Sequence, residues 1–196
     1  MYATRSPDQV SWFEANPATS VDFVRRAIEG GARSVIDVGG GASRLVDRLL
    51  DEQLERVAVL DVSSRALAAA SERLGARAGG VHWIVGDVTE LQDVGSFELW
   101  HDRAVFHFLV AEEDRGRYLK LMERTVPTGG FVIIATFGLD GPERCSGLDV
   151  RRYDPALLSG ELGGDFELLE ATFGPHPETV RRTPTRSASG LAPISW

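Results

Sequence analysis

The sequence predicts an α/β fold in which helices cover both faces of a doubly wound, mainly parallel sheet. Short apolar runs that suit buried strands alternate along the chain with segments whose apolar residues recur at helical spacing. The run FVIIATF at 131–137 is almost continuously apolar, which indicates a strand buried on both faces. Polar residues follow several of the other runs, at the strand ends where sheets of this kind bind ligands.

The composition is typical of one globular domain, 1–196, because the 196 residues are 43% hydrophobic and 26% charged. The formal net charge of −8 disfavours a nucleic-acid partner, since phosphate binding needs a basic face. No apolar run at the N-terminus resembles a signal peptide or a membrane span, so we expect no membrane partner and a cytoplasmic location. The single cysteine, Cys145, cannot form an internal disulfide.

The stretch VIDVGGGAS at 35–43 is the centre of the predicted site. A helix from Asn16-Pro17 to Gly30-Gly31 precedes it. The stretch itself indicates a strand and a glycine turn, and Ser43 can cap a following helix that carries Leu45, Val46, Leu49 and Leu50. Glycines let a ligand approach the backbone, and the positive end of a helix favours a carboxylate or a phosphate. The alternative is an ordinary strand-to-helix turn that binds nothing.

The later elements continue the alternation of strand and helix. Four further strands are predicted: VAVLD at 57–61, VHWIV at 81–85, FELW at 97–100 and a sixth strand at 166–171. Helices are expected after Ser63 or Ser64, before Pro127 and from Asp154-Pro155 onward. We expect no strong seventh strand beyond these, and the polar stretch from Arg181 to Ser189 is expected to be mobile.

Two acidic residues at strand ends suggest a nucleotide site. Asp61 ends the second strand, where a carboxylate can accept the hydroxyl protons of a ribose, and Asp87 follows the third strand, where it can accept a hydrogen bond from an adenine amino group. Alternatively, Asp61 caps the next helix and Asp87 only forms a turn. Trp12 and Phe13 either pack onto the first helix or cover the glycine loop. The set suits a nicotinamide dinucleotide or S-adenosylmethionine, although DVGGGAS lacks the third glycine of a dinucleotide loop.

Five motifs in order resemble the class I S-adenosylmethionine-dependent methyltransferases: DVGGGAS, VLDVS, GDV, ELWHDRAVFHFL and VPTGGFVIIATF. This resemblance implies a Rossmann-like sheet and S-adenosylmethionine as cofactor. Within that class, SWFEANP, WHDRAVFHFL and ATFGLDGPERCSGL are similar to a bacterial group related to small protein-lysine methyltransferases that act on citrate synthase or elongation factors. The implied acceptor is a protein lysine or a small-molecule amine.

The resemblance also implies site residues. Gly39, Gly41 and Ser43 would face the methionyl end of the cofactor, Asp61 its ribose, and Asp87 and Val88 its adenine. The complete cofactor-binding set that we expect comprises Trp12, Asp37, Gly39, Gly40, Gly41, Ser43, Asp61, Val62, Asp87, Val88 and His101. Residues 1–31 are expected to supply a cofactor-covering segment and a helix, and residues 181–196 an atypical C-terminal tail in which Pro193 interrupts the only apolar run.

Candidate catalytic residues follow the fourth strand. Methyl transfer is an in-line displacement that depends mainly on alignment, but an amine acceptor must lose a proton, which Asp102, His101 or His107 can take. Asp102 can alternatively cap a helix that begins near Arg103, and His107 can be a packed core histidine. The two histidines are not spaced as metal ligands on one helical face, so no metal is predicted. Arg152, Tyr153 and Cys145 lie where substrate loops often occur, with surface or packing roles as the alternative.

Two other functions remain open at this point. A nicotinamide-dependent oxidoreductase would use the same adenosine site, although the chain has no tyrosine-x-x-x-lysine pair. A non-catalytic protein that binds an adenosyl ligand would retain the fold without turnover.

Overall fold

The computed structural model describes residues 17–41, 43–103, 105–172 and 178–184, the last range by its backbone. The strands are β1 (Ser34–Val38), β2 (Arg56–Asp61), β3 (Val81–Val85), β4 (Leu99–Arg103), β5 (Phe131–Thr136), β6 (Arg144–Cys145), β7 (Leu148–Asp149), β8 (Phe166–Thr172) and β9 (Glu178–Pro184). The helices are α1 (Ala18–Glu29), α2 (Leu45–Leu49), α3 (Ser64–Leu74), α4 (Glu112–Thr125) and α5 (Pro155–Leu162), with the short 3₁₀ helices η2 (Gly75–Gly80) and η3 (Phe106–Phe108).

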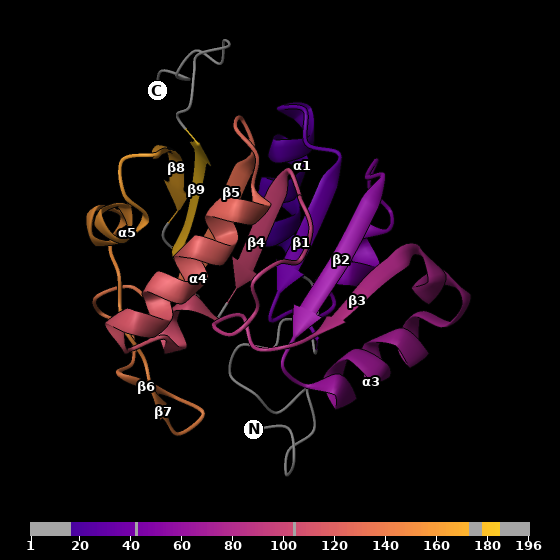
Figure 1. Cartoon of the computed structure of the whole chain (residues 1–196), viewed down its shortest axis with the longest axis horizontal. Coiled ribbons are helices and arrows are strands. Elements are labelled where there is room, and N and C mark those ends of the chain that lie inside the picture. The colour runs from indigo at the N-terminus through magenta and orange to yellow at the C-terminus, as the bar shows by residue number, and fades with distance from the viewer. Residues whose placement is uncertain (1–16, 42, 104, 173–177, 185–196) are drawn as a thin grey trace.

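Seven of these strands form one sheet in the order β3-β2-β1-β4-β5-β9-β8, with β6 and β7 as a separate hairpin. The pairings from β3 to β5 are all parallel, and β9 is antiparallel to both β5 and β8. Figure 1 shows α4 in front of the sheet and α1 behind it. The predicted doubly wound, mainly parallel α/β sheet is confirmed.

Strand residues alternate between two apolar clusters, one on each face of the sheet, because successive side chains of a strand point to opposite faces. Val35, Val57 and Leu99 pack with residues of α1, α2 and α3. Ile36, Ala58 and Trp100 pack on the other face, with residues of α4 and α5. All six residues of β5 are buried, as its apolar sequence predicts. This two-sided cover leaves the C-terminal ends of the parallel strands as the place for a site.

The fourth strand differs from its prediction in where it begins and ends. FELW was expected to form the strand and the next three residues to follow it, whereas β4 spans Leu99–Arg103. The pairing explains the shift, because His101 lies opposite Asp37 of β1 and Asp102 lies opposite Val38 and Ile134. His101 and Asp102 are therefore inside the sheet, with 1% and 0% of their surface exposed.

The prediction that no strong seventh strand follows is wrong. Residues 178–184 form β9, which pairs along its length with β5 and with β8. The sequence ETVRRTP carries no apolar run, but hydrogen bonding on both sides fixes its backbone as a strand. The expected tail at 181–196 and the expected mobile stretch from Arg181 therefore include residues 181–184 of a paired strand.

Two smaller expectations concern helix ends. Ser63 caps α3, since its Oγ accepts a hydrogen bond from the Ala66 amide at 3.2 Å. Asp154 caps α5 in the same way, through the Leu157 amide at 2.7 Å. Within the described ranges, no helix has the length and apolarity needed to cross a membrane.

Candidate functional site

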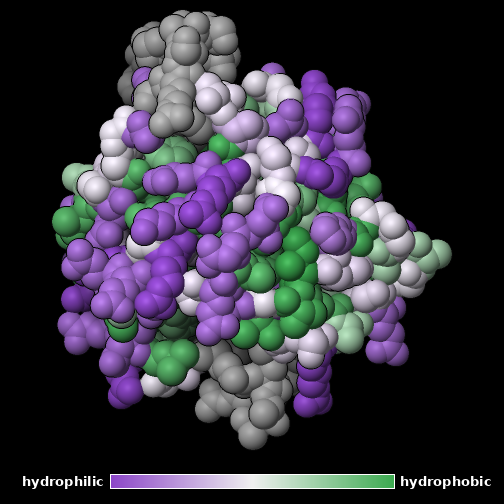
Figure 2. Space-filling model, in the orientation of Figure 1, coloured by the Kyte–Doolittle hydropathy of each residue, from purple (hydrophilic) through white to green (hydrophobic). Residues whose placement is uncertain are grey.

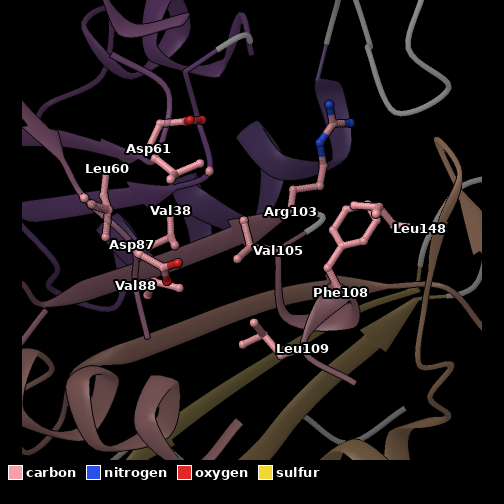
Figure 3. A pocket seen from close by; sticks show the side chains of 13 residues that line it. Val38, Leu60, Asp61, Asp87, Val88, Arg103, Val105, Phe108, Leu109 and Leu148 are labelled. Carbon is pink, nitrogen blue, oxygen red and sulfur yellow. The ribbon is translucent and has the colours of Figure 1, made fainter. Parts of the chain in front are cut away.

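A pocket of about 390 Å³ lies at the C-terminal ends of the parallel strands. One part of its wall comes from the ends of β1, β2 and β3 and the turns after them: Val38, Gly39, Leu60, Asp61, Val62, Gly86, Asp87 and Val88. The other part comes from the end of β4, from the residues after it and from the β6–β7 hairpin: Arg103, Val105, Phe108, Leu109 and Leu148. Figure 3 shows Asp61 and Asp87 at one side of this pocket and Phe108 and Leu148 at the other.

The surface near this pocket is partly apolar. Figure 2 shows hydrophobic residues gathered over the C-terminal ends of β2 and β3. Val62, directly after β2, and Val85, the last residue of β3, are 68% and 57% exposed. Exposed valines beside a buried carboxylate suit a ligand that has both a flat apolar part and hydroxyl groups.

The glycine turn after β1 is shaped by the acids beneath it. Gly39 has a φ of +73°, and a Cβ there would lie 2.2 Å from Cγ2 of Val105. A Cβ at Gly40 would lie 2.1 Å from Oδ2 of Asp37. A Cβ at Gly41 would lie 2.8 Å from Oδ2 of Asp61. Glycine is therefore required at all three positions for the backbone to cross these side chains.

The helix after the turn is shorter than expected. α2 covers five residues, its N-cap is Arg44, and Leu50 lies beyond its last residue. Ser43 was predicted as the cap and lies one position earlier, although its Oγ still accepts a hydrogen bond from the Leu45 amide at 3.0 Å. A helix of five residues sums few peptide dipoles, so the expected attraction of its N-terminus for an anion is small.

Asp61 is the buried acid of the pocket, with 5% of its surface exposed. Oδ1 accepts a hydrogen bond from the Ser63 amide at 2.7 Å, and Oδ2 accepts one from the Gly41 amide at 3.1 Å. Burial raises the pKa of Asp61 above the usual carboxyl value, and the two backbone hydrogen bonds oppose that rise. Each carboxylate oxygen keeps a further lone pair, so Asp61 can accept two more hydrogen bonds from a ligand.

Asp87 and Val88 lie on the next turn. The Oδ1 of Asp87 accepts hydrogen bonds from the Thr89 amide at 2.8 Å and the Thr89 hydroxyl at 2.7 Å, the bonds of a turn-forming aspartate. Its carboxylate also lines the pocket, beside the buried Val88. The turn-forming interpretation of Asp87 is therefore confirmed, and adenine recognition by its carboxylate stays a prediction.

A buried pair joins Asp37 of β1 to His101 of β4. Asp37 Oδ1 and His101 Nδ1 are 2.7 Å apart, and both side chains are almost fully buried. The other atoms of the pair, Asp37 Oδ2 and His101 Nε2, have no hydrogen-bond partner among the described residues. Oδ2 lies directly beneath Gly40 of the glycine turn, so the pair supports the floor of the site.

Asp102 faces the opposite side of the sheet and does not line the pocket. Its carboxylate accepts hydrogen bonds from the Val105 amide at 2.8 Å, the Phe106 amide at 3.0 Å and the Tyr118 hydroxyl at 2.7 Å. The Tyr118 hydroxyl in turn accepts one from Trp100 Nε1 at 2.7 Å. Burial raises the pKa of Asp102 to about 6. This geometry supports the alternative left open by the sequence, a cap, here of the 3₁₀ helix η3.

His107 is fully buried beside the rings of Phe108 and Phe137, with ring centroids 4.3 and 4.7 Å away. Neither of its ring nitrogens has a hydrogen-bond partner in the described ranges. Burial lowers the pKa of His107 to about 4, so the ring is neutral near neutral pH. Its place supports the alternative of a packed core histidine. Neither His107 nor His101 is part of the pocket wall.

The remaining candidates after β5 have packing or surface contacts. Tyr153 is buried in the core, Cys145 is buried in β6, and Arg152 contacts the Gly141 carbonyl and Glu143. Trp12 and Phe13 lie outside the described residues. Over the part of the chain that the structure describes, no three His, Cys, Asp or Glu side chains gather where they could hold a metal ion.

Sequence reasoning missed one side of the pocket. Val105, Phe108 and Leu109 belong to the apolar run VFHFL, which was interpreted through its histidine. Leu148 lies far along the chain, and the signal for it was the Ser146-Gly147 pair, which indicates a tight turn between two short strands. Neither signal says that the two segments meet at one pocket.

We compared the sequence and the fold with those of known proteins. Residues 35–130 match a family model described as a methyltransferase domain, and this range holds β1 to β4 and the pocket's acids. No curated protein matches the sequence. The fold is similar to solved structures of methyltransferases.

One is the 1,6-didemethyltoxoflavin-N1-methyltransferase of Burkholderia thailandensis with 1,6-didemethyltoxoflavin and S-adenosylhomocysteine bound. The TM-score is 0.72 at 22% identity, over 88% of this chain and 79% of that one. Another is the N-methyltransferase NodS of Bradyrhizobium japonicum with S-adenosylhomocysteine, at a TM-score of 0.70 and 17% identity over 86% of each chain.

The fold with its pocket at the strand ends defines a class I methyltransferase architecture. The methyltransferase-domain match over 35–130 supports S-adenosylmethionine-dependent methyl transfer as the activity of a chain with this fold.

Proposed function

We propose that this chain binds S-adenosylmethionine across the described pocket and transfers its methyl group to a small, largely apolar acceptor molecule. The residues 1–196 act as one catalytic domain in this proposal. The observation that carries it is Asp61, a buried carboxylate with spare lone pairs on the wall of a pocket that is otherwise mainly apolar.

The adenosyl part of the cofactor fits the side of the pocket formed by β2 and β3. The two ribose hydroxyls are donors, and Asp61 is the acceptor that they need. Val62 and Val88 supply apolar surface for the adenine ring, with Asp87 beside them for the amino group. Gly39, Gly40, Gly41 and Ser43 would lie along the methionyl end.

The pair of Asp37 and His101 is proposed to hold the glycine turn in place for the methionyl end. Asp37 Oδ2 lies under Gly40 of the turn, and neither Asp37 nor His101 is part of the pocket wall. The pair therefore acts on the cofactor through the backbone above it.

Methyl transfer itself makes few demands on the protein. The bond from sulfur to the methyl carbon breaks as the acceptor's lone pair forms a new bond to that carbon, and the sulfonium becomes a neutral thioether. A nitrogen acceptor then releases a proton, which water can take. Because the described contacts of Asp102 and His107 face the core, the proposal requires neither as a base.

The acceptor side favours a small molecule over a lysine. Val105, Phe108, Leu109 and Leu148 supply no carboxylate to attract an ammonium group. The similar enzyme from Burkholderia thailandensis holds a small acceptor, which supports this choice. A protein lysine is the second candidate, and the motif WHDRAVFHFL, with its resemblance to lysine methyltransferases, is the observation in its favour.

Titration calorimetry with S-adenosylhomocysteine tests the cofactor site. Asp61→Ala removes charge-assisted hydrogen bonds worth about 1.5–3 kcal/mol each, so affinity should fall at least tenfold. Asp93→Ala is the matched control, because Asp93 also accepts a backbone amide, from Gly95, but is not part of the pocket wall. Equal affinity in wild type and Asp61→Ala would overturn the assignment.

Turnover decides between the remaining functions. Labelled S-adenosylmethionine is incubated with small aromatic amines and, separately, with unfolded protein and lysine-containing peptides. Transfer to the peptides alone supports the lysine candidate. Tight binding without transfer to any acceptor supports a non-catalytic adenosyl-binding protein.

A further inference from the structure

The segment between β5 and α5 carries a short hairpin to the edge of the pocket. The hairpin consists of β6 and β7, in which Arg144 pairs with Asp149 and Cys145 with Leu148. Ser146 and Gly147 form its turn, with φ angles of 53° and 85°. Two successive positive φ angles are those of the tight turn that best fits the twist of two antiparallel strands.

This hairpin is held from below. Cys145 is buried, the Arg151 amide donates to the His107 carbonyl at 2.7 Å, and the Tyr153 amide donates to the Phe137 carbonyl at 2.9 Å. The backbone bond to His107 ties the segment to η3, the same 3₁₀ helix that holds Phe108. The position of Leu148 relative to Phe108 is therefore fixed by backbone hydrogen bonds.

Leu148 remains 51% exposed although it lines the pocket. In Figure 3, Leu148 and the ring of Phe108 lie at the side of the pocket away from Asp61 and Asp87. Phe108 and the half-exposed Leu148 present apolar surface to a ligand in the pocket. The acids that can bind the hydroxyl and amino groups of the cofactor are at the other side.

We propose that Phe108 and Leu148 form an acceptor subsite that takes the flat apolar body of the methyl acceptor. The inference rests on the proposed function, because it places the acceptor at the end of the pocket that the adenosyl group does not use. The pocket volume of about 390 Å³ is near the small end for a ligand site. The room left beside the bound cofactor therefore fits only a compact acceptor body.

The hairpin would then set specificity by shape and not by charge. A planar ring packed against Phe108 and Leu148 would remove much of their apolar surface, and its own, from contact with water. A lysine side chain would cover little of either residue. The nucleophilic atom of the acceptor lies at the edge of the ring that points toward the methyl group.

The test uses 6-aminoquinoline as a flat, weakly basic and fluorescent probe, titrated into the protein saturated with S-adenosylhomocysteine. Saturable binding is expected for the wild type, and Leu148→Ala should weaken it at least fivefold. Leu157→Ala is the matched control, because Leu157 is 48% exposed on α5 and is not part of the pocket wall. Its binding of the probe should stay within twofold of the wild type.

Affinity for S-adenosylhomocysteine is measured first and separates the two possible failures. If it does not depend on Asp61, the proposed function fails before the probe is added. If it does, but the wild-type complex does not bind 6-aminoquinoline, or Leu148→Ala binds it as tightly as the wild type, then the acceptor subsite is wrong. Stronger binding of a lysine-containing peptide than of the probe would also overturn it.

Discussion

Asp61 is the last residue of β2 and Asp102 the last but one of β4, the two strands on either side of β1. Both are buried, yet their surroundings differ. Asp61 accepts two backbone amides and lines the pocket. Asp102 accepts two backbone amides and a tyrosine hydroxyl and does not line it. The same residue type near the C-terminal ends of the two strands that flank β1 therefore lines the pocket in one case and stabilises a folded loop in the other.

The two-residue period of a strand explains the difference. Asp102 lies opposite Val38, whose side chain belongs to the apolar face covered by α4, and Tyr118 of α4 reaches its carboxylate. Asp61 follows Leu60 of that same face and therefore points to the other face, where the glycine turn passes over it. A shift of one position along the strand would exchange the two roles.

The largest expected effect comes from Asp102→Ala, which would leave three donors without an acceptor. Buried unpaired donors cost about 1–3 kcal/mol each, so the free energy of unfolding should fall by about 4 kcal/mol. Urea unfolding followed by circular dichroism measures this loss. The folded variant should bind S-adenosylhomocysteine within twofold of the wild type, and a tenfold loss of affinity would show that the comparison between the two acids is wrong.

Next in size is the effect of pH on Asp102. Its pKa of about 6 in the folded protein lies above the usual aspartate value of 3.8, so the folded state binds this proton more tightly than the unfolded state. Stability from this group is present at about pH 4 and is lost as the pH rises through 6, by at most about 3 kcal/mol. The Asp102→Asn variant lacks this titrating carboxyl group. The free energy of unfolding of the wild type minus that of the variant should therefore decrease between pH 4 and pH 7.

His107 changes stability in the opposite direction over the same range, because burial lowers its pKa to about 4 and the unfolded state is protonated first as the pH falls. Both proteins in the comparison contain His107, so its effect cancels in the difference. If the stability difference between the wild type and Asp102→Asn stays constant between pH 4 and pH 7, the raised pKa of Asp102 is contradicted.

For Asp61 the corresponding effect is on binding. Its pKa is raised by burial, so lowering the pH should protonate it before ordinary carboxyl groups and remove acceptors for the ribose. Affinity for S-adenosylhomocysteine should fall about tenfold, or about 1.4 kcal/mol, once Asp61 is protonated. Calorimetry from pH 7.5 downward measures it, and Asp61→Asn should show weak binding with little change over the same range.

An effect of about the same size is expected from Tyr118→Phe, which removes one of the three donors to Asp102 and an acceptor for Trp100. A buried hydrogen bond to a charged group contributes a net of about 1.5 kcal/mol, and the stability should fall by about that amount. Urea unfolding measures it alongside Asp102→Ala. A loss as large as that of Asp102→Ala would mean that the two backbone amides contribute nothing.

Most of the fold could be predicted because local sequence determines it. The apolar runs of β2, β3 and β5 and the caps Ser63 and Asp154 lie where the sequence indicates. The ends of β4 could not be found in this way. His101 and Asp102 are polar, and only their partners Asp37 and Tyr118, distant in sequence, make their burial favourable.

The candidate site was predictable in part for the same reason. Asp61, Val62, Asp87, Val88 and Gly39 line the pocket, as a site at strand ends requires. Asp102 was chosen for its position after an apolar run, and sequence alone does not reveal which face of the sheet a strand-end residue meets. The contribution of Leu148 depends on backbone bonds between segments far apart in the chain.

The position of β9 has a consequence for synthesis of the chain. β9 separates β5 from β8 in the sheet, although it follows both in sequence. Until residues 178–184 have been made, one edge of β5 has no partner strand, and β5 is the strand whose six residues are all buried in the finished protein. An unpaired apolar edge is a template for pairing with another chain. Nascent chains stopped after β8 should therefore aggregate more readily than chains that include β9.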